Sequence, residues 1–362
     1  MINERAPLVS VVISAFNAEG YISAAINSVL AQSYGNFEIL VMDDGSTDGT
    51  SSILQKFALK DRRIHLFSQI NRGITYSLNH LIHLSQGEFI ARLDADDVSY
   101  PDRFAKQVNY LLSHPQVGLV STWVQNVTSE GLTINCLCYP DDHGWISKVL
   151  DEGRNPFAHS SVMLRGDLLR SILGPYRFHS SQDFDLWLRL LPFTMFAIVP
   201  EVLVAVRQHP SSLSATNHAR RLQIHKLIHD LYLDRKLGIS DENWKEREEK
   251  LLSSIRKNSN AINENFNGAS YYKGLAMQMN GNQKEARKAF RESWSTPMRF
   301  KAMLRYCLSL LPTEIIESLI IYNNKRHRRY GSLLEYSCLL SKAVDRQEQR
   351  DMELFWKKIH GA

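Results

Sequence analysis

The 362-residue chain has no long apolar segment. A helix that spans a bilayer needs roughly 18 to 20 consecutive apolar residues, and no run in the sequence approaches that length. The apolar stretch near the N-terminus is too short and too strand-like to be a signal peptide. These absences predict a cytoplasmic protein, and they leave open peripheral contact with the inner face of the cell membrane.

Cysteine and phosphate-binding glycine motifs are also scarce. The four cysteines show no metal-binding spacing, and Cys136 and Cys138 would point to opposite faces of a strand, so packing is their expected role. Neither G-x-G-x-x-G after the first expected strand nor G-x-x-x-x-G-K-[ST] anywhere is present. A nucleotide bound by this chain would therefore have its phosphates held by a metal.

Charge of one sign is not in large excess, since 43 Lys and Arg oppose 38 Asp and Glu. The basic residues are unevenly spread, with K-R-H-R-R at 325–329 and a second group at Arg220, Arg221 and Lys226. Such clusters indicate either a solvated helix face or contact with anionic lipid. No aromatic platform or reading helix accompanies them, so nucleic acid is not expected as a partner.

The first part of the sequence alternates strands and helices. Strands are expected at 8–13, 37–42, 64–67, 89–93 and 117–121, with helical periodicity between them. This alternation predicts an α/β fold whose mostly parallel sheet carries helices on both faces. The polar clusters S-A-F-N, D-D-G-S-T-D and D-A-D-D each follow a strand, at the sheet edge where such folds bind ligands.

Beyond about residue 214 every periodic segment is helical. We therefore expect a catalytic domain at 1–213 and an all-α C-terminal region at 214–362, which would contact a membrane surface, the acceptor or a second copy of the chain. Residues 272–290 resemble one tetratricopeptide unit. A single unit cannot close a solenoid, so a plain helical hairpin is the expectation there.

Two acidic segments carry more carboxylates than folding needs. Asp102 suits the cap of the helix that follows it, whereas Asp94 and Asp96 lie too far upstream for that role. Two acids separated by one small residue suit a hard divalent cation, which would also offset their repulsion. Asp43 and Asp44 exceed what their turn requires and could accept hydrogen bonds from a base or a ribose.

Several ordered motifs strongly resemble family 2 inverting glycosyltransferases of the GT-A fold, of the polysaccharide and O-antigen biosynthesis type. The segments are V-V-I-S-A-F-N-A-E-G-Y, E-I-L-V-M-D-D-G-S-T-D-G-T, N-R-G-I-T-Y-S-L-N, G-E-F-I-A-R-L-D-A-D-D and D-F-D-L-W-L-R, within about residues 7–210. The resemblance implies a hexosyl or N-acetylhexosaminyl transferase that uses a nucleotide-diphosphate sugar, with UDP expected. It also implies Mn²⁺ or Mg²⁺ at the D-x-D element and a glycan or lipid-linked oligosaccharide as acceptor.

The resemblance assigns roles to individual residues. Asp96 and Asp94 match the metal-binding acids, Asp44 matches the acid that reads the uracil edge, and Asp183 matches the catalytic base. The donor-side set is Ser14, Phe16, Asp44, Gly73, Asp94 and Ala95. Gln182 stands where the family commonly has Glu, and Leu78 stands where many members carry Arg.

Other assignments keep an alternative. His159 matches an acceptor-side position or is structural, and Trp187 either stacks on a sugar or packs in the core. Arg207 and His209 either close over the diphosphate or lie in a solvated loop. Asp185 is a weaker candidate for the base, because about 200° of helix separates it from Asp183.

Two other functions compete with the transferase. A sugar nucleotidyltransferase would need a glycine- and arginine-rich loop after the first strand, which S-A-F-N-A-E-G-Y does not supply. A non-catalytic scaffold finds support only in Gln182.

Overall fold

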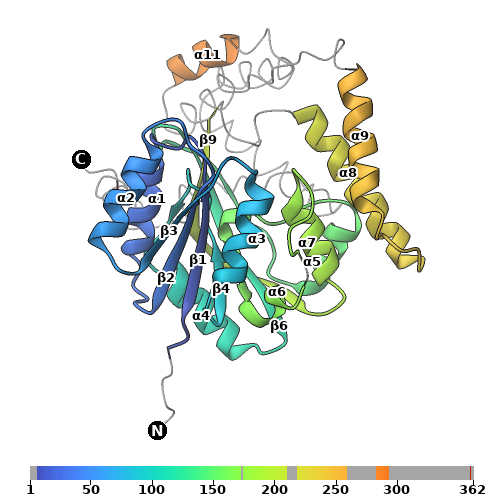
Figure 1. The fold of residues 1–362 in the computed structure, drawn as a ribbon, viewed down its shortest axis with the longest axis horizontal. Coiled ribbons are helices and arrows are strands. Elements are labelled where there is room, and N and C mark those ends of the chain that lie inside the picture. The colour runs from blue at the N-terminus through green and yellow to red at the C-terminus, as the bar shows by residue number, and fades with distance from the viewer. Residues whose placement is uncertain (1–5, 173, 210–217, 259–282, 293–358, 360–362) are drawn as a thin grey trace.

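A nine-stranded sheet forms the centre of the protein in a computed structural model that describes residues 6–172, 174–209, 218–258, 283–292 and 359 (Figure 1). Its strand order is β3-β2-β1-β4-β8-β6-β9-β5, and β7 pairs with β6. The strands are β1 (Val9–Ala15), β2 (Phe37–Asp43), β3 (Ile64–Ser68), β4 (Phe89–Arg92), β5 (Val98–Ser99), β6 (Val117–Thr128), β7 (Thr133–Leu137), β8 (Met163–Arg165) and β9 (Met195–Gln208).

Helices cover both faces of this sheet, as the sequence predicts. The helices are α1 (Ile22–Leu30), α2 (Thr50–Lys60), α3 (Ile74–Leu84), α4 (Arg103–Ser113), α5 (His143–Asp151), α6 (Gly166–Arg170), α7 (Gln182–Leu190), α8 (His218–Lys236), α9 (Trp244–Asn258) and α11 (Gln283–Glu292), with a 3-10 turn, η1, at His159–Ser161. Alternation along β1 divides the core: Val11 and Ile13 pack in the cluster that includes α1 and α4, whereas Val12 packs in the cluster that includes α3 and α7.

The sheet is mixed, and its parallel part is the first half. Strands β3, β2, β1 and β4 are parallel neighbours, as the alternation of strands and helices predicts. The expected strand at 117–121 is the start of β6, but it does not pair with β4. Instead the three-residue strand β8 lies between them and is antiparallel to both. Parallel pairing returns between β6 and β9. The fold class is thus confirmed, and the sheet beyond β4 is more mixed than the alternation predicts.

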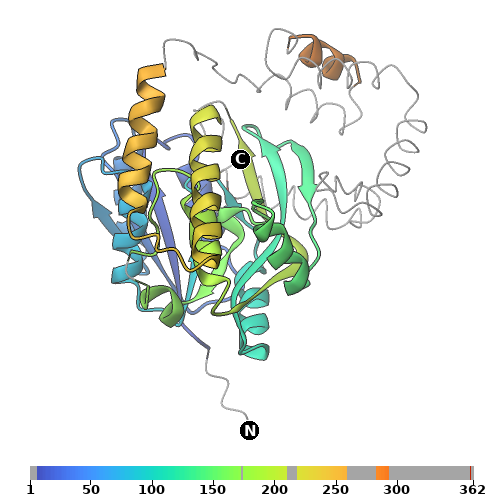
Figure 2. The ribbon, with the colours of Figure 1, turned by 90° about the vertical axis from the view of Figure 1, so that its right-hand side faces the viewer.

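Helix α8 continues the core of the sheet domain past the predicted boundary. Ile224, Ile228 and Leu231 of α8 are buried in the same cluster as Phe184 and Trp187 of α7, and α9 lies alongside α8 (Figure 2). The division into 1–213 and 214–362 stays a prediction.

Much of the predicted C-terminal region lies outside the described residues. The features outside the described residues include most of the tetratricopeptide-like segment 272–290, the basic run 325–329, and Cys307 and Cys338. Among the described helices, none combines the length and apolar character needed to cross a membrane.

Residue 359 packs against the sheet domain. The Ile359 side chain is 2% exposed and lies with Ala24, Val98 and Tyr100 in a small apolar cluster. Its carbonyl accepts a hydrogen bond from Asn27 Nδ2 at 3.1 Å. A residue far along the chain thus completes the packing between α1 and β5.

A buried polar network joins α4 to β6, η1 and the residue before β8. Arg103 Nη2 donates to the Val162 carbonyl at 3.0 Å, and Arg103 Nε donates to Gln107 Oε1 at 2.9 Å. Gln107 Nε2 in turn donates to the carbonyls of Val120 and Ser161 at 3.0 and 2.9 Å. Arg103 and Gln107 are both fully buried. Since unpaired buried polar groups are costly, this network fixes the distance between α4, β6 and η1.

We expect Gln107→Met to lower the free energy of unfolding by about 2 to 4 kcal/mol, because it leaves two buried carbonyls and Arg103 Nε without their partner. Gln55→Met, on the exposed face of α2, is the matched control and should stay within about 0.5 kcal/mol of wild type. Urea unfolding followed by circular dichroism measures both. Equal values for the two variants would contradict the importance of the network.

Candidate active site

Asp44 organises the loop that follows β3. Strands β1 and β2 are parallel, and the Asp44 amide donates to the Ala15 carbonyl at 2.8 Å, so the acid lies beside the carboxyl end of β1. Its buried carboxylate accepts the backbone N–H groups of Arg72 and Gly73, both at 2.8 Å, and Gln69 Nε2 at 2.6 Å. Gly73 has φ +87°, a conformation that favours glycine. Asp44 thus shapes the loop at 69–73.

The other predicted donor-side residues lie along the same edge. Ser14 is half-buried near the end of β1, and Phe16, directly after that strand, is 50% exposed. Ala95 is nearly buried in the loop after β4. Because β1, β2 and β4 are parallel neighbours, the structure brings these positions to one edge of the sheet. The exposed Phe16 ring is the surface there on which a planar base could stack.

Asp94 is held by groups from two elements. The buried Arg92 side chain at the end of β4 pairs with Asp94 Oδ1. From η1, the Ser160 hydroxyl lies 2.9 Å from Asp94 Oδ2 and 3.0 Å from the Asp94 amide. Desolvation would raise the pKa of Asp94, but Arg92, His159 and Ser160 together bring that pKa below its ordinary value. Asp94 is therefore ionised at neutral pH.

Asp97 supports the loop after β4 through buried contacts. Its buried carboxylate accepts the Arg207 amide at 2.8 Å and also contacts the Ser160 hydroxyl. Burial, followed by the charges of Asp96 and Asp94, raises the pKa of Asp97 well above its ordinary value. Asp97 thus connects the acidic loop to the end of β9 and to η1. Asp102 stands at the N-cap position of α4 as predicted, but its carboxylate accepts from Ser33 Oγ at 2.8 Å rather than from a helix amide.

Arg207 and His209 bring the end of β9 against Asp96. Arg207 is buried; its Nε donates to the Asp96 carbonyl at 2.9 Å, and its guanidinium lies 4.9 Å from the centre of the Tyr21 ring. His209 Nε2 lies 2.8 Å from Asp96 Oδ2, and its ring lies 4.7 Å from Tyr21. The Arg207 guanidinium thus holds the loop in this conformation, and its contact with a diphosphate stays a prediction. His209 is not in a solvated loop but beside the predicted metal ligand.

The residues around Asp96 fit an open site for a divalent cation. A carboxylate oxygen and an imidazole nitrogen meet at 2.8 Å, and both are common ligands of Mn²⁺. Within the described part of the chain, no three His, Cys, Asp or Glu side chains gather closely enough to form a complete metal site. Mg²⁺ and similar ions are often bound by one or two carboxylates, with substrate phosphates and water completing the shell.

Asp183 and Asp185, on the first turn of α7, have opposite environments. Asp185 is fully buried and accepts Arg177 Nε and Arg189 Nε, both at 2.9 Å. Asp183 is half-buried, and its Oδ2 accepts Asn155 Nδ2 at 2.8 Å. The helical rotation between the two acids turns Asp185 into the core, so the weaker assignment of Asp185 as the base is wrong. Asp183 remains the candidate.

His159 lies between the two groups of acids. Its Nε2 is 2.7 Å from the Tyr176 hydroxyl. Burial, followed by the charge of Arg92, lowers the pKa of His159 to about 4, although the nearby Asp183 and Asp94 act in the opposite direction. The imidazole is consequently neutral at pH 7. Ser160, next to His159, contacts Asp94, and Asn155 of the same segment contacts Asp183, so this segment joins the donor-side and acceptor-side residues.

Trp187 does not line an open surface. Its ring is fully buried and lies edge-on to Phe157, with centroids 6.0 Å apart, and 6.2 Å from the His159 ring. Of the two roles that the sequence allows, packing is the one that the structure shows. In this conformation no face of the indole is available for stacking on a sugar.

Sequence reasoning missed several residues that support the site. Asn155 and Ser160 stand in N-P-F-A-H-S-S, a segment without periodicity. Of its residues, the sequence assigns a role only to His159. A charged Arg92 inside an otherwise apolar strand was a usable signal, since buried charge requires a partner. For Tyr21, which contacts His209 across the site, the sequence contains no local signal.

Comparison with known proteins places this site in a family. The family model described as glycosyl transferase family 2 matches residues 10–159. Putative glycosyltransferase EpsE of Bacillus subtilis is 31% identical over 243 residues, which cover 65% of this chain and 85% of that protein. The O-antigen biosynthesis glycosyltransferase WbnJ of Escherichia coli is 30% identical over 209 residues, covering 57% and 81%.

A solved structure supports the fold. S. aureus TarS 1–349, crystallised in complex with UDP-GlcNAc, superposes with a TM-score of 0.50 at 16% identity, covering 83% of this chain and 88% of that one. At this identity the likeness concerns the GT-A fold.

The contrast between the two acids of α7 predicts different effects on stability. Asp185→Asn should lower the free energy of unfolding by about 3 kcal/mol, because Arg189 would keep a largely buried charge without a carboxylate and Arg177 would keep only Asp241 as its partner. Asp183→Asn should change it by less than about 1 kcal/mol. Chemical denaturation of both variants measures this difference. A larger loss of stability for Asp183→Asn than for Asp185→Asn would show that Asp183, and not Asp185, is the acid that supports the fold.

Proposed function

The chain belongs to glycosyl transferase family 2, and from that premise we propose that it transfers a sugar, with inversion, from a nucleoside-diphosphate sugar to a hydroxyl group. The acceptor that we propose is a glycan or a lipid-linked oligosaccharide, in line with the O-antigen role named for the relative WbnJ. The observation that carries the proposal is that one segment contacts both acids, since Ser160 contacts Asp94 and Asn155 contacts Asp183. A donor-side acid and a candidate base thus share one site.

The donor would bind at the carboxyl ends of β1 and β2. The half-exposed Phe16 offers a face for the base, and the loop shaped by Asp44 offers polar groups at its edge. Asp44 already accepts three N–H groups, so its main contribution would be to hold the base pocket in shape. UDP-GlcNAc, with which TarS was crystallised, is the first donor to test.

Asp96 and His209 would hold Mn²⁺ or Mg²⁺, with Asp94 close to the ribose and the metal. When bound, such a cation offsets the negative charge that develops on the leaving diphosphate, an effect of several kcal/mol. Arg207 and Ser160 position Asp96, Asp94 and Asp97 for this role from β9 and η1.

Asp183 would act as the general base. One of its oxygens is bonded to Asn155, and the other would accept the proton of the acceptor hydroxyl as that hydroxyl attacks the anomeric carbon. A positioned base of this kind contributes roughly 100- to 10,000-fold to the rate. Attack on the face opposite the leaving diphosphate gives inversion in a single displacement. Neutral His159 and Tyr176 would border the acceptor.

The test is turnover of nucleotide sugars by the purified chain with Mn²⁺ and glycan acceptors, followed by released nucleoside diphosphate and by NMR of the product anomer. We expect Asp183→Asn to lower kcat about 100- to 10,000-fold while UDP binding stays within about threefold. Asp167→Asn, at an exposed acid of α6, is the control and should behave as wild type. Absence of both turnover and nucleotide binding across the donor panel would overturn the proposal and favour a scaffold.

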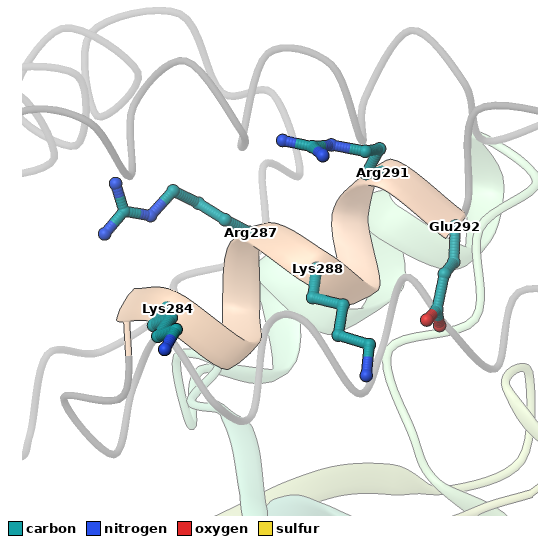
Figure 3. A pocket seen from close by; sticks show the side chains of 5 residues that line it. All are labelled: Lys284, Arg287, Lys288, Arg291 and Glu292. Atoms are coloured by element: carbon teal, nitrogen blue, oxygen red, sulfur yellow. The ribbon is translucent and has the colours of Figure 1, made fainter.

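We also propose that the C-terminal region contacts anionic lipid through α11. Four cations of this helix lie at i, i+3, i+4 and i+7, so they share one face, opposite the buried Ala286, Ala289 and Phe290. These cations are Lys284, Arg287, Lys288 and Arg291 (Figure 3). Each basic residue near an anionic surface contributes roughly 1 kcal/mol. Such contact would keep the enzyme near a lipid-linked acceptor.

Replacing these four cations with Gln should lower binding to vesicles that contain anionic lipid by at least about tenfold. The control neutralises four exposed cations of other elements, Lys56, Lys60, Arg62 and Lys245. Vesicle sedimentation at low and high salt measures both. Equal pelleting of the two variants would exclude α11 as the lipid-binding face.

A further inference from the structure

We propose that Asn155 is a positioning residue for Asp183, and that it determines which carboxylate oxygen meets the acceptor hydroxyl. Asn155 Nδ2 donates to Asp183 Oδ2 at 2.8 Å. The two residues come from different elements, since Asn155 lies in the segment between α5 and η1, and Asp183 lies on the first turn of α7. This inference rests on the proposed role of Asp183 as the base.

The backbone fixes the orientation of the Asn155 amide. Asn155 Oδ1 accepts the Phe157 N–H at 3.1 Å, so the NH₂ group is the end that faces Asp183. The reverse orientation would turn the Asn155 amide oxygen toward the Asp183 carboxylate, so that two acceptors would face each other. It would also leave the Phe157 N–H facing the Asn155 NH₂ group, so that two donors would face each other. A side chain oriented in this way is a preorganised donor.

The entry into α7 also constrains Asp183. Ser181, at the N-cap, has φ +52°, a left-handed conformation that is unusual for a residue other than glycine. Helix α7 therefore starts directly after Ser181, and Asp183 stands in its first turn. The backbone of that turn sets the direction of the Asp183 side chain. The hydrogen bond from Asn155 then selects the orientation of the carboxylate itself.

Three ionisable groups whose pKa is affected by the charge of Asp183 are neutral at pH 7. They are His159 of η1, Tyr176 of the segment before α7, and His225 of α8. Burial lowers the pKa of both histidines and raises that of Tyr176. In the part of the chain that the structure describes, Asn155 is the side chain that donates to the Asp183 carboxylate. The amide thus holds the base without the competing charge that an arginine or lysine would bring.

Holding Oδ2 directs Oδ1 toward the acceptor. General-base catalysis needs the base within about 2.6 to 3.2 Å of the donor oxygen, and a displacement of about 1 Å can cost about 100-fold in rate. Because the proposed donor contacts lie at β1, β2 and β4, loss of the Asn155 contact should affect the chemical step and not donor binding.

The test compares steady-state kinetics and pH profiles with UDP-GlcNAc or whichever nucleotide sugar proves to be the donor. We expect Asn155→Ala to lower kcat about 10- to 100-fold with the donor KM within about twofold of wild type. Asn155→Asp, which is nearly isosteric, puts a second acid beside Asp183. Since two adjacent carboxylates resist double ionisation, the acidic limb of its kcat profile should move to higher pH by about one unit or more.

Asn79→Ala is the matched control. Asn79 also bridges backbone groups, accepting the Tyr176 N–H at 2.9 Å and donating to the Tyr176 carbonyl at 2.8 Å, but it does not contact Asp183. Its removal should loosen the same region, lowering the melting temperature to a similar degree as Asn155→Ala while leaving the pH profile of kcat at its wild-type position.

Two results would overturn the inference while the proposed function stands. One is wild-type kcat in Asn155→Ala beside an inactive Asp183→Asn. The other is a wild-type pH profile in Asn155→Asp together with equal kcat losses in Asn155→Ala and Asn79→Ala, which would indicate a purely structural role. Full activity of Asp183→Asn would instead overturn the base assignment, and this inference with it.

Discussion

The concentration of negative charge after β4 is the constraint on which the rest of the site depends. Asp94, Asp96 and Asp97 fall within four residues at the end of a buried strand. Each has its own supporting group: Arg92 pairs with Asp94, His209 meets Asp96, and the Arg207 amide donates to Asp97. These partners come from two strands and the segment after β9. The position of β9 and η1 is thus coupled to the stability of the acidic loop.

The same charges decide which groups are ionised. Arg92 stabilises the charged form of Asp94 and destabilises the charged form of His159, so one buried cation acts on both sides of the site. The Arg92 side chain is buried, so solvent screens these effects less than it would at the surface. The result is a neutral imidazole in a segment that contacts both Asp94 and Asp183.

The parts of the fold and the site that the sequence predicts are those that depend on residues close together in the chain. The strands β1 to β4 were predicted because each is a short apolar run followed by a polar turn, and parallel pairing then places Asp44 and Asp94 at one edge. The three-residue strand β8 has no periodicity to detect. Contacts between distant residues were also missed, including His209 with Asp96, 113 positions apart, and Asn155 with Asp183. For Trp187, local pattern could not decide between burial and exposure, since both suit an aromatic residue.

The packing of Ile359 has a consequence for the order of folding. Its carbonyl accepts a hydrogen bond from Asn27, 332 positions earlier, and its side chain packs with Val98 and Tyr100, which directly follow the acidic loop. Chains emerge from the ribosome from the N-terminus, and domains generally fold as units during synthesis. The sheet can therefore form early, but this apolar corner stays in contact with solvent until residue 359 has emerged. During that interval the corner is a surface to which chaperones or neighbouring nascent chains can bind.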